Sequence, residues 1–207
     1  IDFKKLYFLD ETIGFVVGTG GKMYKTSDQG ENWTLVDLGI SDDVLNIDFY
    51  SENHGAICGT NGLIMITEDG GVSWMQSPIL QSDEIRSVAF VNDQWLIAIA
   101  AQFVIQSYDG GETWVRSTGD FRSIDFPSDS IGFATAYYGG ASRTKDGGNT
   151  WELMNLNTLQ YLNDINFLNT DTGYAVGGSE VFRTFDGGDN WTSIDNPAQT
   201  SLYSIDF

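Results

Sequence analysis

The feature that most constrains the fold is an eight-residue motif that recurs along the chain at nearly constant spacing. Its copies are "TSDQGENW", "TEDGGVSW", "SYDGGETW", "TKDGGNTW" and "TFDGGDNW", and their final tryptophans are 41, 40, 37 and 40 residues apart. An internal period of this length predicts a repeat architecture in which each unit is one supersecondary structure.

Each unit contains four short segments of β-type sequence. In the unit that holds the last copy these are "LNDINF" (162–167), "GYAVGG" (173–178), "EVFRTF" (180–185) and "NWTSI" (190–194), separated by turn-forming residues. Helical spacing is not sustained anywhere in the sequence. Four antiparallel strands repeated about every forty residues are typical of a propeller blade, so we predict an all-β propeller of four-stranded antiparallel blades.

The repeat divides the 207 residues into five complete units and the start of another. The expected units span residues 3–40, 41–80, 81–118, 119–158 and 159–197, and "LYSIDF" (202–207) matches the first strand of a sixth. The whole chain therefore indicates a single propeller domain or a propeller fragment. We expect a fragment of a propeller with roughly six to eight blades; the alternative is that the last segment displaces the N-terminal strand and closes the ring.

Composition excludes several partners. The chain carries 29 acidic and 10 basic residues, a formal net charge of -19. This charge repels phosphate groups, so nucleic acid and anionic bilayers are poor partners. No apolar run approaches the ~18 residues of a membrane-spanning helix, so membrane insertion is not expected. The single cysteine, Cys58, excludes an internal disulfide.

The repeated motif has a structural and a metal-binding interpretation. A short Asp side chain can accept backbone N–H groups within its own turn, the glycines permit positive φ, and the Trp can cover the turn. A Ca²⁺ loop would need several converging oxygens, whereas each motif offers one reliable carboxylate. We therefore expect structural roles, and neither metal nor cofactor, for Asp28, Asp69, Asp109, Asp146, Asp186, Trp33, Trp74, Trp114, Trp151 and Trp191.

The pattern Ser/Thr-x-Asp-x-Gly-x-x-Trp resembles the Asp-box, or BNR, repeat of bacterial neuraminidases. The combination of "GYAVGG" with "VFRTFDGGDNW" is similar, more narrowly, to the Ycf48/HCF136-type propeller, the photosystem II assembly factor family. The resemblance implies that the box lies between the third and fourth strands, away from the usual binding face. Because relatives also occur as secreted and surface modules, it further implies an extracellular, cell-surface or periplasmic location.

Catalysis has little support in the sequence. A sialidase would require an arginine trio, a Tyr nucleophile with a Glu partner and an Asp acid, but the chain has five arginines, two of which, Arg143 and Arg183, lie at equivalent positions beside the box. The only histidine, His54, has no recognisable nucleophile partner. We therefore predict that the chain is not an enzyme; a glycan-binding or glycoside-hydrolysing propeller is the alternative.

A binding role has better support. The loops from the fourth strand to the next first strand, and from the second to the third, open on the same face of a propeller, and exposed arginines and aromatics are typical of interfaces. We expect a protein partner, with a glycan as a second possibility, on a loop-lined face that carries Lys4, Lys5, Arg86, Arg122, Tyr137, Tyr138, Tyr161 and Tyr203.

Overall fold

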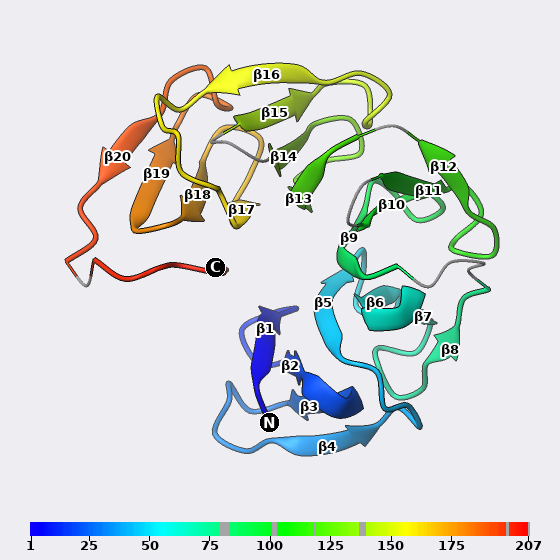
Figure 1. The fold of residues 1–207 in the computed structure, drawn as a ribbon. Helices are drawn as coiled ribbons and strands as arrows, with labels where there is room; N and C mark the ends of the chain where they lie inside the picture. The colour runs from blue at the N-terminus through cyan, green and yellow to red at the C-terminus, as the bar shows by residue number, and fades with distance from the viewer. Residues whose placement is uncertain (79–82, 101–102, 118, 137–139, 198, 207) are drawn as a thin grey trace. The chain divides into compact units, whose positions relative to one another are not determined.

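The computed structural model describes residues 1–78, 83–100, 103–117, 119–136, 140–197 and 199–206. This part of the chain contains twenty β-strands and two short 3-10 turns, Thr19–Gly21 and Thr60–Gly62, but no α-helix. The strands form five antiparallel sheets of four strands each, and every sheet is built from strands that are consecutive in the sequence (Figure 1). The predicted all-β class with four-stranded antiparallel blades is confirmed.

The sheets are named blades 1 to 5 in chain order. Blade 1 contains β1 (Phe3–Phe8), β2 (Gly14–Gly18), β3 (Lys22–Thr26) and β4 (Thr34–Asp37); blade 2 contains β5 (Val44–Phe49), β6 (Gly55–Gly59), β7 (Ile64–Thr67) and β8 (Met75–Gln76). Blade 3 contains β9 (Ile85–Phe90), β10 (Leu96–Ala100), β11 (Val104–Ser107) and β12 (Val115–Ser117). Blade 4 contains β13 (Phe121–Asp125), β14 (Gly132–Ala136), β15 (Gly140–Thr144) and β16 (Glu152–Asn155), and blade 5 contains β17 (Asp164–Phe167), β18 (Gly173–Gly177), β19 (Glu180–Thr184) and β20 (Thr192–Ile194).

The chain divides into two compact units. Unit 1, Ile1–Ser117, holds blades 1 to 3, and unit 2, Thr118–Phe207, holds blades 4 and 5. Each blade lies inside one of the repeat units expected from the sequence, and the division falls between blades 3 and 4. No helix in the described ranges is long and apolar enough to cross a membrane.

The core of each unit lies between neighbouring blades. We call the face of a blade that packs on the preceding blade its leading face, and the opposite one its trailing face. In unit 1, Phe15 and Met23 on the trailing face of blade 1 are buried against Ile47 and Phe49 on the leading face of blade 2, and the rings of Phe15 and Phe49 stack at 4.9 Å. In unit 2 the ring of Phe133, which is equivalent to Phe15, stacks on Phe167. Apolar residues of the inner strands thus hold successive blades together.

The segment expected to begin a sixth blade forms no strand among the described residues. It is attached to unit 2 in another way: the N–H of Leu202 donates to the carbonyl of Gly178 at 2.8 Å, and the hydroxyl of Ser204 and the N–H of Ile205 donate to Asp164 at 2.9 and 3.0 Å. Phe207 lies outside the described residues. The segment therefore adjoins blade 5 through the side chains of Asp164 and Asn163 and a backbone bond to Gly178, without a ladder.

Candidate functional site

Each box Asp is bonded within its own loop. In the fourth box, Oδ1 of Asp146 accepts the hydroxyl of Thr144 and the N–H of Thr150, both at 2.8 Å, and Oδ2 accepts the hydroxyl of Thr150 at 2.6 Å. The other boxes repeat the pattern, with a polar side chain in the place of Thr150 at Asn32, Ser73, Thr113 and Asn190. These residues, which the sequence analysis did not single out, could have been found from their fixed place before the Trp.

The donors stabilise the charged form of the box carboxylates. The side-chain hydrogen bond from Thr150 is the largest cause that lowers the pKa of Asp146, followed by its backbone N–H. The hydroxyl and the N–H of Ser73 lower the pKa of Asp69 to about 2. Since the acceptor oxygens are already engaged, the loop has little left to offer a cation. No group of three potential metal ligands occurs in the described part of the chain.

The box tryptophans close over the loops. The indole N–H of Trp33, Trp114 and Trp151 donates to the carbonyl of the glycine at the fifth position of its own box, at 3.0, 3.2 and 3.1 Å respectively. The rings of Trp74 and Trp191 contact Phe49 and Phe167 edge-on, each at the end of the first strand of its own blade. The boxes therefore join the outer part of a blade to its core.

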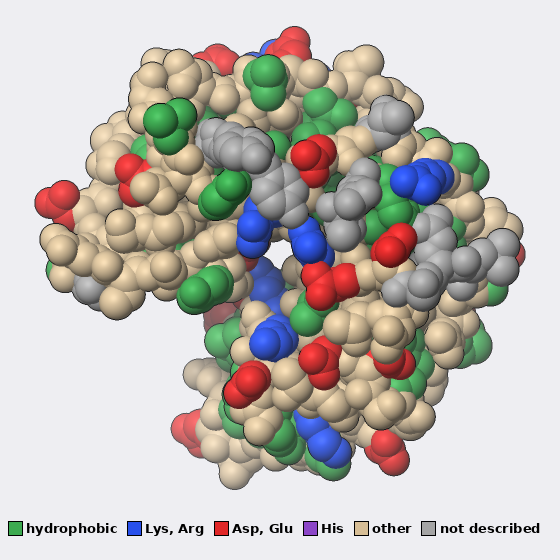
Figure 2. Space-filling model, viewed as in Figure 1, with side chains coloured by type: hydrophobic (Ala, Val, Ile, Leu, Met, Phe, Trp, Pro, Cys, Tyr) green, Lys and Arg blue, Asp and Glu red, His purple; other side chains and the backbone are tan. Residues whose placement is uncertain are grey.

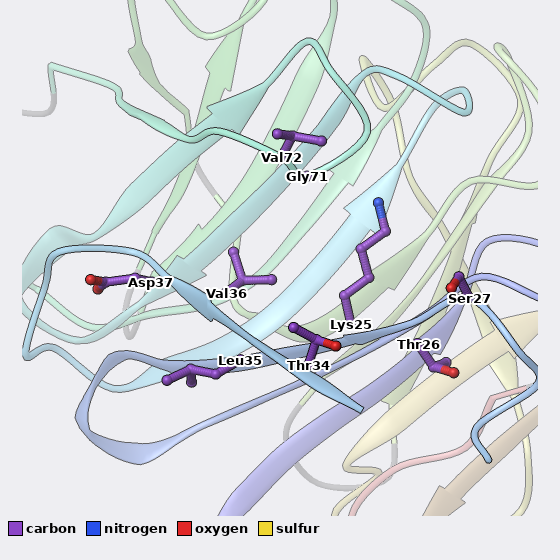
Figure 3. A pocket seen from close by; sticks show the side chains of 9 residues that line it. All are labelled: Lys25, Thr26, Ser27, Thr34, Leu35, Val36, Asp37, Gly71 and Val72. Atoms are coloured by element: carbon purple, nitrogen blue, oxygen red, sulfur yellow. The ribbon is translucent and has the colours of Figure 1, made fainter. Parts of the chain in front are cut away.

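A cation on the third strand links a blade to the box of the next one. Nζ of Lys25 donates to the carbonyl of Gly70 at 2.7 Å, and the guanidinium of Arg143 donates to the carbonyl of Gly187 at 2.7 Å and to Asp189 at 2.8 Å. Figure 3 shows Lys25 reaching from β3 toward the second box loop. It lies in an open groove of about 470 Å³ between that loop and β4.

The expected binding cations of unit 1 differ in exposure. Lys4 is exposed, whereas Lys5 is only 9% exposed and so presents little of its charge to solvent. The half-buried Arg86 forms an ion pair with Glu84 at 2.8 Å. Figure 2 shows basic and acidic side chains interspersed on the viewed face. A ligand of these cations would therefore compete with acidic groups of the chain itself.

In unit 2 two of the expected residues, Tyr161 and Tyr203, lie on stretches that meet at the start of the last segment. Arg122 is half-buried, Tyr161 is exposed, and Tyr203 is 76% exposed. The side-chain amide of Asn163 donates to the carbonyl of Leu202 at 2.6 Å, which brings the stretches that carry the two tyrosines together. Tyr137 and Tyr138 lie outside the described residues. That all eight expected residues share one face remains a prediction.

The sequence analysis missed the acidic residues that connect first strands. Asp48 and Asp125 occupy the same place in β5 and β13, and Ser123 donates to Asp164 at 2.6 Å across blades 4 and 5. Their recurrence at the blade period was the available signal. In blade 3 the equivalent residue is Ala89, which has no carboxylate.

The comparison with protein families decides the assignment. The profile of the family described as "Photosynthesis system II assembly factor YCF48" matches residues 27–128 and 143–207, which is most of the chain. The chain belongs to the YCF48 family. The resemblance stated from the Asp-boxes is therefore confirmed.

Solved structures give the same fold. YCF48 bound to D1 peptide has a TM-score of 0.68 at 22% identity, and the match covers 96% of this chain and 68% of that one. YCF48 from Cyanidioschyzon merolae has a TM-score of 0.70 at 21% identity, and the match covers 99% of this chain and 76% of that one. An ancestral GH74 enzyme has a TM-score of 0.72 at 18% identity, and the match covers 93% of this chain and 31% of that one. No match is found among curated proteins.

The family assignment corrects one expectation. The expectation of an extracellular, cell-surface or periplasmic location is wrong. The YCF48 family is described as an assembly factor of photosystem II, and this assembly does not take place at the cell surface. That expectation relied on relatives that occur as secreted and surface modules. The box specifies a hairpin and carries no information about the compartment.

Proposed function

We propose that this chain is a non-catalytic module that binds an extended peptide segment of a protein partner and holds it during assembly. The observation that carries the proposal is the match of the assembly factor YCF48 family to most of the chain. The likeness to a YCF48 structure that contains a D1 peptide agrees with it. A partner bound as a peptide would need a few well-placed anchors and no large preformed cavity.

The proposed anchors occupy equivalent positions in the repeat. Lys4, Arg86 and Arg122 are each the second residue of the first-strand pattern of their blade, and Tyr203 takes that place in the last segment. Arginine and lysine bind carboxylates, and tyrosine adds apolar area with a polar end. We therefore propose that the peptide carries an acidic side chain or a free C-terminal carboxylate. Tyr161 would lie beside the apolar part of the same peptide.

The alternative of a glycan-binding or glycoside-hydrolysing propeller gains only a likeness of fold from the GH74 enzyme. A glycosidase needs two carboxylates that flank the scissile bond. The box carboxylates are engaged by donors of their own loops. The proposal therefore stays with a binding module.

The test is a binding titration with a fluorescently labelled D1 peptide followed by anisotropy. We expect saturable binding that weakens when the peptide C-terminus is amidated and when salt is raised, because exposed charges are screened over ~8–10 Å at physiological ionic strength. A scrambled peptide of the same charge is the control. Equal binding of the scrambled peptide, or no binding of the D1 peptide at any salt concentration, would contradict the proposal.

A further inference from the structure

A groove in unit 1 is lined by a cation and by apolar side chains. It measures about 470 Å³ and lies between β4, the edge strand of blade 1, and the loop of the second box (Figure 3). Two of its lining residues, Leu35 and Val72, are 49% and 74% exposed, and Lys25 is half-buried. The groove is formed by the third and fourth strands and a box, whereas the proposed peptide anchors belong to first strands.

The equivalent place in unit 2 shows how the chain can satisfy such a cation. Arg143 of β15 and Lys25 of β3 each directly precede the Thr that opens a box, so the two cations are equivalent. The guanidinium of Arg143 donates to the carboxylate of Asp189 at 2.8 Å, and one of its nitrogens lies 3.6 Å from a carboxylate oxygen of Glu152. The cation between blades 4 and 5 therefore has two acidic partners.

Lys25 has neither of these acidic partners. The residues at the places of Asp189 and Glu152 are Val72 and Thr34, which carry no charge. Nζ of Lys25 donates to one acceptor, a carbonyl of the second box at 2.7 Å, and forms no ion pair with any residue that the structure describes. An ammonium group has three donors, so the groove contains a cation that can still bind a carboxylate.

The apolar part of the groove is also filled in unit 2 and open in unit 1. Met154 of β16 packs its sulfur against Gly188, the second glycine of the fifth box. In β4 the shorter Val36 takes the place of Met154. The atoms nearest to the Cβ position of the equivalent Gly71 belong to aromatic rings and not to Val36. The groove therefore has room for an apolar side chain next to the cation.

Blades 2 and 3 use a third arrangement. Their residues at the places of Lys25 and Val36 are Ile66 and Ser77. Ile66 is buried in the core, and the hydroxyl of Ser77 donates to the carbonyl of Gly111 in the third box. Of the three blade contacts that lie within the units, the contact between blades 1 and 2 is thus the one whose third-strand cation has no acidic partner among the described residues.

We propose that this groove binds an extended segment of a protein partner in which an acidic side chain stands next to an apolar one. The carboxylate binds Nζ of Lys25, as Asp189 binds its cation in unit 2. The apolar side chain takes the place of Met154 and packs on Val36 and Val72. An extended segment suits the site because β4 is an edge strand, to which a further strand can be added. The groove gives the chain a second attachment site, on residues other than the proposed peptide anchors.

The test is an anisotropy titration with a labelled peptide of alternating Glu and Leu residues. We expect saturable binding, and binding at least about tenfold weaker for the matched Gln-Leu peptide, because it loses the charge-assisted bond to Lys25. Val72→Asp supplies from the chain itself the carboxylate that Asp189 supplies in unit 2. It should therefore weaken the Glu-Leu peptide at least about tenfold without lowering the melting temperature. Val115→Asp, the same change at an exposed position of β12, is the control.

A second variant and a second measurement locate the contact. Val36→Met fills the apolar part of the groove without a change of charge and should also weaken the Glu-Leu peptide. The methyl signals of Val36 and Val72 in NMR spectra should shift as this peptide is added. Equal binding of the Gln-Leu peptide, or equal effects of Val72→Asp and Val115→Asp, would overturn the proposal. So would signal changes confined to the surroundings of Lys4 and Arg86, which would leave the proposed peptide anchors in place; the two proposals can therefore fail separately.

Discussion

The carboxylate of Asp125 accepts a hydrogen bond of 2.7 Å from the backbone N–H of Phe167, the last residue of the first strand of the next blade. The same link joins Asp48 to the N–H of Phe90 at 2.8 Å in unit 1. First strands of neighbouring blades share no ladder, so a side chain satisfies a backbone donor that the sheet leaves unpaired.

Replacing this carboxylate should therefore destabilise unit 2. Asp125→Ala leaves the N–H of Phe167 without its acceptor, and we expect the free energy of unfolding to fall by about 1–3 kcal/mol. Asp125→Asn keeps an acceptor oxygen and should lose less. Urea denaturation measures both, with Asp129→Ala, an exposed residue of the same blade, as the control. Equal losses for Asp125→Ala and Asp129→Ala would show that the link contributes nothing.

A second prediction concerns a box glycine. Gly71 has φ +78°, and an added Cβ would lie 2.8 Å from the ring of Phe15; Gly20 has φ +68° but open space around it. Gly20→Ala should cost about 1 kcal/mol from the backbone alone. Gly71→Ala adds a clash with the core and should cost about 1–3 kcal/mol more. The difference between the two variants in thermal unfolding isolates the cost of the clash with Phe15. Similar losses of stability in both variants would mean that the Phe15 ring moves aside.

The boxes should also make the free energy of unfolding depend on pH. The pKa of Asp69 is lowered from 3.8 to about 2, chiefly by the side chain of Ser73. A lowered folded pKa means that the stabilisation is complete above the unfolded value and is lost as pH falls through the folded one. We expect the free energy of unfolding to decline from about pH 4 toward pH 2, and to decline less steeply in Asp69→Asn. Denaturation across this range checks it, and parallel curves would refute it.

A fourth prediction addresses the proposed anchors. Arg86→Glu combined with Arg122→Glu should raise the dissociation constant of the D1 peptide at least about tenfold. It should change stability by at most about 1 kcal/mol, because partly exposed ion pairs such as Arg86–Glu84 contribute little to folding. Lys22→Glu combined with Lys145→Glu changes charge equally at exposed positions outside the first strands. If the two double variants bind the peptide equally, the effect is one of net charge, and the search moves to Tyr161 and Tyr203.

The blades could be predicted from the sequence because their determinants are local. A box such as the one around Asp146 is closed by hydrogen bonds between residues two to four positions apart. Strand pairing within a blade is equally short in sequence, and the fixed period of the tryptophans sets the number of blades. Local chemistry repeated many times is the situation in which a sequence pattern constrains a fold best.

Contacts between blades were less accessible to sequence reasoning. Asp125 and Phe167 are separated by 42 residues, and nothing near either one shows that they meet. The low exposure of Lys5 has the same origin, since it depends on how strands are packed and not on the residue itself. For the candidate site the sequence predicted residue types at equivalent positions, whereas the acidic partner of Arg86 came from the structure.

The buried carboxylate of Asp164 accepts hydrogen bonds from Ser123 of blade 4 and from Ser204 and Ile205 of the last segment. One carboxylate therefore couples three stretches of chain, and the last of them depends on it for two of its bonds. Because that segment has no ladder, it can detach as a whole while blade 5 stays intact. Amide hydrogen exchange in residues 202–206 should then report on a separate opening event, with a rate set by a few hydrogen bonds, those of Asp164 among them, and not by the unfolding of a sheet.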